Sequence, residues 1–360
     1  MRIVAHNGAR IWGGAERATV LLLEGLSKRG HEVTLLCNSE LVASEARRKG
    51  IAASICVLGG DIAIPDSFRL ASVLRTLRPD AFIVGTYKKL FLAGLGARLA
   101  RVPRVIARVG LETDTPRSIK YRFALRRWID GVVVNARRIV EPFARLRGFG
   151  RDRVALIHNG VSSAMHATPD GDLRRDLGLT QADFVIGTVA RLAKQKRIDR
   201  LVRIVSLLPA DVHCVIAGDG PRQSDVTRLA AELGVASRVH FLGHRDDTAS
   251  VLETLDLFIV TSDSEGLSNA MLEAMSFGLP IVGTPVSGSE DALGGIGDEP
   301  AAGVIAGFSP ETLAAEIMSL RDDPERRAFL GKAAKSRAIR DFSLDTMLDR
   351  WEAFLAPAPR

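Results

Sequence analysis

Short runs of apolar residues alternate, along the whole chain, with longer stretches whose apolar residues recur at helical spacing. This alternation is typical of parallel β-sheets in which a helix follows each strand. In the first half we expect strands at residues 2–6, 33–37, 81–84, 104–108, 131–134 and 154–157. In the second half we expect strands at residues 184–189, 213–217, 239–242, 257–260 and 280–283. The pattern predicts an α/β protein with two parallel sheets, and 360 residues suffice for two domains.

The two series of strands are separated by polar residues with turn signals. Asn159-Gly160 predicts a turn, and the proline-containing residues 162–172 are expected to form a linker. We therefore expect a first domain at 1–163 and a second at 164–340. The terminal helix, within 341–360, is expected to pack back on the first domain.

Composition adds that this is an ordinary globular chain. Apolar residues make up 46% and charged residues 25%, which excludes global disorder. Cys37, Cys56 and Cys214 form no Cys-x-x-Cys pair, so neither a disulfide framework nor a zinc site is indicated and a reducing compartment fits. We find no signal segment and no apolar run of about 18 residues that could span a bilayer. A cytoplasmic location is expected.

Charge is distributed unevenly along the chain. The net charge is +7, yet residues 1–168 hold 28 Lys and Arg against 13 Asp and Glu, whereas the remainder holds 21 against 29. A basic first half indicates an anionic partner, which could be a membrane face, a nucleic acid or a phosphorylated substrate. A solvated arginine-rich surface is the alternative interpretation.

Ligands of open α/β sheets collect where strands run into helices. After the first strand, Gly8 and Gly13-Gly14 form a glycine-rich loop that would let a phosphate approach a helix N-terminus. The dinucleotide spacing G-x-G-x-x-G is absent, so an NAD-dependent oxidoreductase is poorly supported. Glycines that only serve a tight turn remain the alternative.

Two cations follow the first strand of the second domain. Arg191 offers a bidentate fork to phosphate oxygens, and Lys196 adds a compact charge, so the pair suits a diphosphate. Each charged hydrogen bond contributes on the order of 1.5–3 kcal/mol. Taken alone, the segment could equally present two solvated cations on a loop.

Two carboxylates eight positions apart follow the strand at 257–260. Glu265 is expected in a loop and Glu273 within an otherwise apolar helix that Ser268 or Asn269 caps. The two hydroxyls of a ribose would supply donors for Glu273, and backbone N–H groups at 266–268 could face phosphate oxygens. Alternatively, Glu273 pairs with an arginine and Glu265 is a surface turn residue.

In this order, the Gly-Gly loop, Arg191 and Lys196, Gly218-Asp219-Gly220-Pro221 and the Glu-x7-Glu spacing of Glu265 and Glu273 resemble a known family. The chain is similar to the retaining GT-B glycosyltransferases called glycosyl transferases group 1. The likeness covers nearly the whole chain and is strongest at 186–285. It implies two Rossmann-like domains whose parallel sheets face each other across a cleft.

The resemblance also implies roles for single residues. Arg191 and Lys196 would bind the donor diphosphate and, with Glu265, carry catalysis, because charge develops there during transfer. Glu273 would hold the ribose, and Glu265 would hold the hydroxyls of the transferred sugar. The backbone of Gly14 would contact the donor diphosphate. Further implied donor contacts are Gly218, Leu242, Arg245, Gly266, Leu267 and Ser268. The implied acceptor contacts are Gly13, Glu16, Arg108 and Glu112.

The family's retaining reaction implies a front-face substitution in which the leaving phosphate helps to deprotonate the acceptor. No metal and no resident cofactor are expected. The expected co-substrate is a nucleotide-diphosphate sugar, and a UDP-sugar is the first candidate. One departure concerns Val109, where many members carry a histidine. We hypothesise that the donor sugar lacks, or presents differently, the hydroxymethyl group that this histidine contacts, or that Glu112 or Arg108 replaces it.

The acceptor side of the first domain is basic. Residues 117–129 predict an amphipathic helix with Ile119, Phe123 and Trp128 available to pack. The candidate membrane contacts are Lys88, Lys89, Arg117, Lys120, Arg122, Arg126 and Arg127. Near an anionic leaflet each adds about 1 kcal/mol, so we expect a peripheral enzyme at the inner face of the cytoplasmic membrane. Its acceptor would be a lipid-linked or lipopolysaccharide-type glycan.

Several other functions stay open at this point. Nucleic acid is a weaker candidate partner, because aromatic residues are only 5% and no stacking platform is visible. A nucleotide-sugar epimerase or a phosphorylase would suit the same architecture. A sugar-nucleotide-binding subunit without catalysis is the alternative from another class of protein.

Overall fold

The computed structural model describes residues 1–60, 63–162, 173–295 and 300–356. The chain forms two compact units. Unit 1 comprises Met1–Asn159 together with Leu344–Arg360, and unit 2 comprises Gly160–Ser343. Apart from Ser162, the linker expected at 162–172 lies outside the described residues, as does the expected boundary at 163 and 164.

Unit 1 contains a seven-stranded parallel sheet in the order β3-β2-β1-β4-β5-β6-β7. Its strands are β1 (Arg2–Asn7), β2 (Glu32–Cys37), β3 (Ala52–Ile55), β4 (Ala81–Val84), β5 (Arg104–Val109), β6 (Gly131–Val134) and β7 (Val154–Leu156). Its helices are α1 (Gly14–Lys28), α2 (Glu40–Arg48), α3 (Ile64–Leu77), η1 (Tyr87–Lys89), α4 (Leu90–Leu99), α5 (Ile119–Trp128), α6 (Arg137–Ala144), η2 (Arg151–Arg153) and α15 (Leu344–Leu355).

Unit 2 contains a six-stranded parallel sheet in the order β10-β9-β8-β11-β12-β13. Its strands are β8 (Phe184–Val189), β9 (Val212–Ala217), β10 (Val239–Gly243), β11 (Leu257–Val260), β12 (Ile281–Gly283) and β13 (Val304–Ile305). Its helices are α7 (Leu173–Asp176), η4 (Lys194–Lys196), α8 (Ile198–Ser206), α9 (Gln223–Glu232), η5 (Ala236–Arg238), α10 (Thr248–Thr254), α11 (Asn269–Phe277), α12 (Ser287–Leu293), α13 (Pro310–Asp322) and α14 (Pro324–Asp341).

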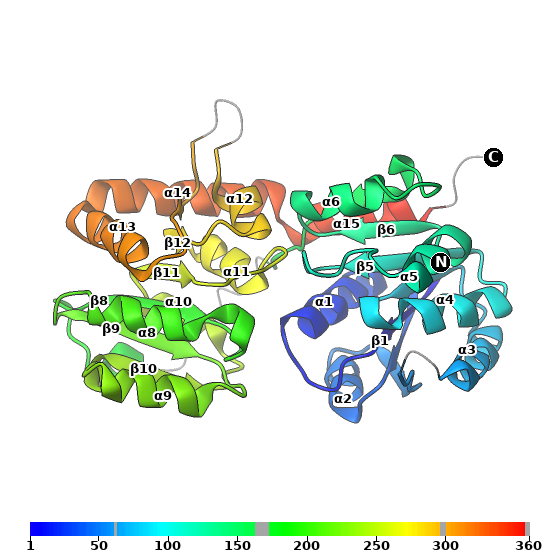
Figure 1. Cartoon of the computed structure of the whole chain (residues 1–360), viewed down its shortest axis with the longest axis horizontal. Coiled ribbons are helices and arrows are strands. Elements are labelled where there is room, and N and C mark those ends of the chain that lie inside the picture. The colour runs from blue at the N-terminus through cyan, green and yellow to red at the C-terminus, as the bar shows by residue number, and fades with distance from the viewer. Residues whose placement is uncertain (61–62, 163–172, 296–299, 357–360) are drawn as a thin grey trace. The chain divides into compact units, whose positions relative to one another are not determined.

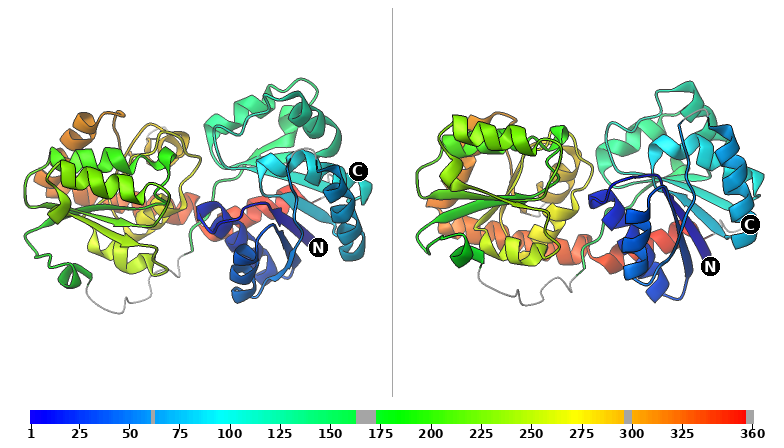
Figure 2. Two further views of the ribbon diagram at one scale, coloured as in Figure 1. Left: turned by 60° about the horizontal axis from the view of Figure 1, so that its bottom comes forward. Right: turned by 90° about the horizontal axis from the view of Figure 1, so that it is seen from below.

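Helices cover both faces of each sheet, as Figures 1 and 2 show. Successive strand residues therefore enter different cores: Val4 and Phe82 belong to one apolar cluster of unit 1, and Ile3 and Ile83 belong to the other. Burial on both faces requires continuous apolar strands, which explains why the strand pattern could be read from the sequence. The predicted α/β fold with two parallel sheets is confirmed.

The sequence prediction missed β3 and β13. The Ala-Ala-Ser start of β3 carries little β propensity, and β13 has only two residues, so sheet pairing decides both. For α5 the prediction was right for Trp128, which packs against the core, but wrong for Ile119 and Phe123, which are 83% and 47% exposed. Ala124 and Leu125 are buried instead. The apolar side chains of α5 thus lie partly on the surface.

The last helix, α15, packs within unit 1. Met347, Leu348 and Trp351 are buried in the same cluster as the strands β1 and β2. Leu348 lies against Gly25 of α1, where a Cβ would come within 2.6 Å of the leucine methyl carbon. Arg29, at the end of α1, donates to the α15 carboxylates Asp345, Asp349 and Glu352. Among the described residues, no helix is long and apolar enough to cross a membrane.

His6, at the end of β1, makes the stability of unit 1 sensitive to acid. The side chain is fully buried, its Nε2 lies 3.0 Å from the carbonyl oxygen of Cys56, and burial lowers its pKa from 6.5 to about 4. Because the folded state disfavours the charged ring, stability is lost as pH falls from 6.5 toward 4, by about 3 kcal/mol in full.

We expect urea unfolding to show this loss by comparing the wild type with His6→Gln at pH 7.5 and pH 5. The free energy of unfolding should fall between these pH values by about 2 kcal/mol more in the wild type than in the variant. His240, whose pKa is also lowered by burial, contributes equally to both proteins and cancels. Equal losses in the two proteins would contradict the assignment to His6.

Candidate functional site

The strand order of unit 2 indicates where along its sheet a ligand would bind. From β8 the chain builds outward through β9 and β10, then returns to place β11 on the other side of β8. Loops that follow β8 and β11 therefore part at this point, where open α/β sheets bind ligands. The loop after β8 carries Arg191 and Lys196, and the loop after β11 carries Glu265.

The Lys196 ammonium contacts the Glu265 carboxylate between these two loops. Ser262 Oγ donates to the same carboxylate at 3.2 Å. Glu265 is only 7% exposed, so it is not a surface turn residue. Burial lowers the pKa of Lys196 to about 8, and the adjoining carboxylate favours the charged ammonium at neutral pH. The structure thus brings together a cation and an anion that the sequence placed 69 residues apart.

Hydrogen bonds to backbone carbonyls hold the two loops together. Thr261 Oγ1 donates to the carbonyl of Lys196 at 2.8 Å, and the Asp263 N–H donates to the carbonyl of Gln195 at 2.9 Å. Sequence reasoning missed Thr261 and Asp263. Their only signal in the sequence was their position beside Glu265, because their partners, Gln195 and Lys196, follow a different strand.

Arg191 is exposed on a loop that the predicted glycine motif holds in place. Gly218 and Gly220 have φ values of +134° and +153°, and a Cβ on Gly218 would overlap the carbonyl oxygen of Ala190. The Leu192 N–H donates to the Asp219 carbonyl at 2.7 Å. Gly218 therefore lets two backbones approach closely. The guanidinium of Arg191 makes no hydrogen bond or ion pair with another described residue.

Glu273 lies on α11, and the structure joins it to the end of β10. Thr248, which is 2% exposed at the start of α10, donates to Glu273 Oε2 at 3.4 Å. Leu242 is the partly buried penultimate residue of β10, and Arg245 follows in the loop with its guanidinium bound to Asp247 at 2.6 and 2.8 Å. Thr248 thus ties Glu273 to the segment after β10, which carries the predicted donor contacts Leu242 and Arg245.

The segment between the two carboxylates begins α11. Ser268 caps the helix, as predicted, because its hydroxyl accepts from the Met271 N–H at 3.5 Å. Gly266 and Leu267 are buried. Gly288 of α12 lies directly against them: a Cβ there would overlap the Gly266 carbonyl oxygen and come within 2.7 Å of Leu267 Cα. Gly288 was not singled out from the sequence.

In unit 1, three of the four predicted acceptor contacts, Gly13, Glu16 and Arg108, lie near the first turns of α1. Gly13 is the N-cap of α1, Gly14 is its first residue, and the Glu16 carboxylate lies 3.3 Å from a Cβ built on Gly13. Arg108 donates to Thr19 Oγ1 at 2.9 Å and Asn159 Oδ1 at 3.1 Å. Burial lowers the pKa of Arg108 to about 10, and Glu16 opposes this shift.

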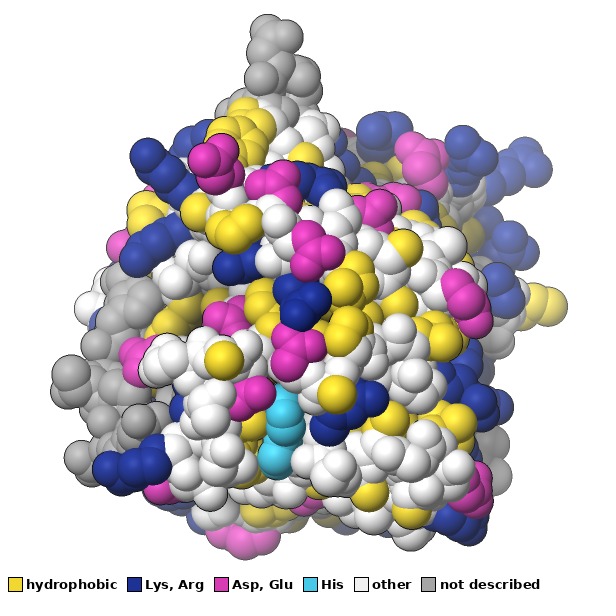
Figure 3. Space-filling model, turned by 90° about the vertical axis from the view of Figure 1, so that its left-hand side faces the viewer, with side chains coloured by type: hydrophobic (Ala, Val, Ile, Leu, Met, Phe, Trp, Pro, Cys, Tyr) yellow, Lys and Arg dark blue, Asp and Glu magenta, His cyan; other side chains and the backbone are white. Residues whose placement is uncertain are grey.

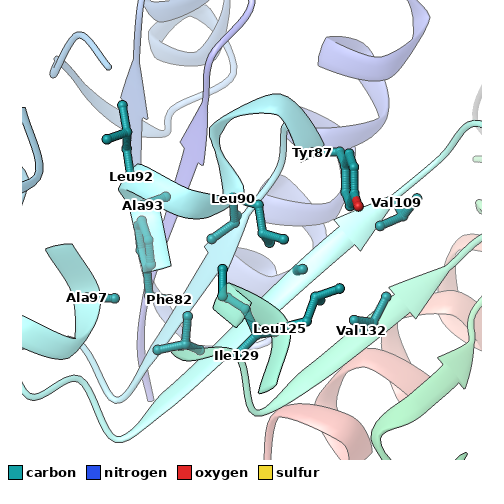
Figure 4. Packing of buried hydrophobic residues seen from close by; sticks show 14 of the residues in the cluster. Phe82, Tyr87, Leu90, Leu92, Ala93, Ala97, Val109, Leu125, Ile129 and Val132 are labelled. Carbon is teal, nitrogen blue, oxygen red and sulfur yellow. The ribbon is translucent and has the colours of Figure 1, made fainter. Parts of the chain in front are cut away.

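Val109 occupies the end of β5 as a core residue. It is 1% exposed and packs in the cluster that includes Tyr87 and Val132 (Figure 4). Glu112 follows in the loop before α5 and is partly buried. The hydroxyl of Tyr87 is buried with no partner among the described residues, so a polar group stands beside the apolar position.

The basic cluster of unit 1 divides into two parts. Lys88, Arg117, Arg122, Arg126 and Arg127 are exposed, and Lys120 lies over the Tyr121 ring at 4.7 Å. Lys89 differs, because its ammonium donates to the Gly59 carbonyl at 2.5 Å. On the face of unit 2 shown in Figure 3, by contrast, acidic side chains are interspersed with basic ones. No group of three or more potential metal ligands occurs in the described part of the chain.

Comparisons with known proteins agree with this arrangement. Residues 170–337 match the family model of glycosyl transferases group 1, and residues 12–164 match that of Glycosyltransferase Family 4. The chain is a glycosyltransferase whose residues 170–337 match group 1. This glycosyltransferase is 26% identical to the lipopolysaccharide core biosynthesis glycosyltransferase LpsE of Rhizobium meliloti (strain 1021), over 96% of this chain and 97% of that protein.

Solved structures share the GT-B fold of this glycosyltransferase. Anabaena HepE in complex with UDP and glucose superposes with a TM-score of 0.86 at 20% identity, over 99% of this chain and all (100%) of that one. WaaG, a glycosyltransferase involved in lipopolysaccharide biosynthesis, superposes with a TM-score of 0.75 at 15% identity, over 99% of this chain and 100% of that one. At these identities the likeness concerns the fold.

Proposed function

We propose that this glycosyltransferase moves a sugar from a nucleoside diphosphate, a UDP-sugar in the first place, to a lipid-linked or lipopolysaccharide-type acceptor. The observation that carries the proposal is the Lys196–Glu265 contact at the point where β8 and β11 part. The LpsE relative supports the acceptor class, and HepE with UDP and glucose supports the donor class.

The chemistry follows from the charges at this edge. Arg191 and Lys196 would stabilise the negative charge that develops on the leaving diphosphate, which usually is the largest contribution of such a site. Glu265 would accept hydrogen bonds from the hydroxyls of the transferred sugar, and Glu273 would accept them from the ribose hydroxyls. With these cations in place, we propose that transfer retains the anomeric configuration and proceeds without a metal ion.

Binding and product analysis test the proposal together. In a thermal-shift screen of UDP, GDP, ADP and TDP at one fixed concentration, UDP should stabilise the protein most. The stabilisation should reach about 2.7 kcal/mol where that concentration is one hundred times the dissociation constant for UDP. Glu273→Gln, which keeps the shape of the side chain but loses its charge, should weaken this binding.

Transfer is then followed by NMR of the product made from the UDP-sugar, with and without EDTA. A glycoside with the donor's anomeric configuration, formed equally in EDTA, is expected. A free epimerised sugar or a sugar phosphate would identify an epimerase or a phosphorylase instead. Nucleotide binding without any product would indicate a non-catalytic binding subunit.

For the acceptor we propose that α5 lies against an anionic leaflet. Its exposed side chains combine the cations Arg122, Arg126 and Arg127 with the apolar Ile119 and Phe123. Such a combination suits an interfacial helix, because cations attract lipid phosphates and apolar side chains enter the headgroup region.

Neutralising α5 should release the protein from membranes. With Arg122, Arg126 and Arg127 all changed to glutamine, binding to vesicles containing phosphatidylglycerol should weaken about a hundred-fold, at about 1 kcal/mol per cation. Co-sedimentation at low salt measures the change. Lys332→Gln with Lys335→Gln, two exposed cations of α14, is the matched control and should bind as the wild type does. An equal loss per cation removed in the two variants would mean that net charge, and not α5, holds the protein.

A further inference from the structure

Arg197 combines a strained backbone with a central place between the two loops of the site. Its φ of +51° and ψ of +47° are left-handed, a conformation that side chains with a Cβ rarely adopt. It directly follows Lys196 and is the N-cap of α8. Strain of this kind persists only where the surrounding contacts enforce it, and it concentrates at functional sites.

The guanidinium of Arg197 shows what enforces this conformation. It donates to Asp263 at 2.9 and 3.2 Å and to Asp199 at 3.0 to 3.3 Å. Arg200, only 6% exposed, donates to Asp263 Oδ1 at 2.7 Å and to the Thr261 carbonyl at 2.5 Å. Asp263 thus receives two arginines from the β8–α8 segment while it lies two residues before Glu265.

Packing alone does not fix the loop on this side. A cavity of about 250 Å³ lies beside it, lined in part by Lys194, Arg197 and Asp263. Lys194 and Arg197, which line this cavity, lie close to Lys196 in the chain, and ionic contacts across the two loops restrain this stretch.

We propose that Arg197 is a positioning residue, whose left-handed backbone and guanidinium together hold Lys196 against Glu265. The inference rests on the proposed function for its catalytic consequence, although the positioning itself is a property of the protein alone. A displacement of about 1 Å in such a site can cost on the order of a hundred-fold in rate, so loss of this restraint matters for transfer.

Arg197→Gly tests the inference, because glycine accepts the left-handed backbone while removing the guanidinium. We expect kcat to fall about ten-fold or more with a melting temperature within about 3 °C of the wild type. Arg101→Gly is the matched control: Arg101 is exposed, also left-handed with φ of +58°, and belongs to unit 1. It should keep the wild-type kcat.

Asp263→Asn removes the charge that both arginines bind but leaves the N–H that donates to Gln195. If the arginine acts through Asp263, the double variant with Arg197→Gly should be no slower than Asp263→Asn alone. Additive losses in kcat, or a kcat loss of Arg197→Gly that merely follows a lower melting temperature, would overturn the proposal.

A second readout does not need activity. The pH dependence of Lys196 acetylation by acetic anhydride, followed by mass spectrometry, reports the pKa of this amine, which is about 8 in the buried position beside Glu265. In Arg197→Gly the pKa should rise toward the ordinary lysine value as Lys196 becomes hydrated. An unchanged pKa would reject the positioning role. If Arg197→Gly shows the pKa shift but the wild type transfers no sugar, the positioning role stands and the proposed function is refuted.

Discussion

Lys196→Ala is expected to lower kcat/KM for sugar transfer by roughly a hundred- to a thousand-fold, the effect of removing one group that stabilises developing charge in a transition state. The ammonium contacts Glu265 at the point where the loops after β8 and β11 diverge. In the wild type kcat/KM should also fall as pH rises above about 8, because Lys196 then loses its proton. Initial rates with a UDP-sugar across pH measure both effects.

Lys194→Ala is the matched control for this variant. Lys194 belongs to the same short helix, η4, but its side chain is exposed. Its loss should change kcat/KM less than three-fold. A fall of less than ten-fold in Lys196→Ala, with the fold intact by circular dichroism, would remove Lys196 from the proposed chemistry.

Gly288→Ala should lower kcat by about a hundred-fold although the residue contributes no functional group. A Cβ at this position would overlap the carbonyl oxygen of Gly266, so the segment between Glu265 and Ser268 must shift. Displacement of catalytic groups by about 1 Å can have an effect of this size. Overpacking should also reduce the free energy of unfolding by about 1–3 kcal/mol. Enzyme assays and urea unfolding measure the two losses.

Gly60→Ala serves as the control for Gly288→Ala, since no described atom beyond its chain neighbours lies within 4 Å of a Cβ at Gly60. It should leave both kcat and stability near the wild-type values. If Gly288→Ala kept its full kcat while losing stability, the loop at 266–268 would not need its present position for transfer.

Sequence patterns predicted the strands well because most of them are buried on both faces. Such strands must be continuously apolar, and a run like that of β4 or β11 is recognisable without any knowledge of its partners. The exceptions obey the same reasoning. β3 is an edge strand with three of its four residues exposed, and α5 keeps Ile119 and Phe123 at the surface, so neither follows the buried pattern.

By itself, the sequence determined the α/β architecture, the family and the cap of α11, since each depends on residues close together in the chain or on motifs in a fixed order. Tertiary structure alone decided that Lys196 contacts Glu265, that Thr248 reaches Glu273 and that Gly288 supports Gly266. These contacts join loops and helices that follow different strands. Sheet order, which arises from packing across the whole unit, brings such loops together, and no local pattern encodes their distances.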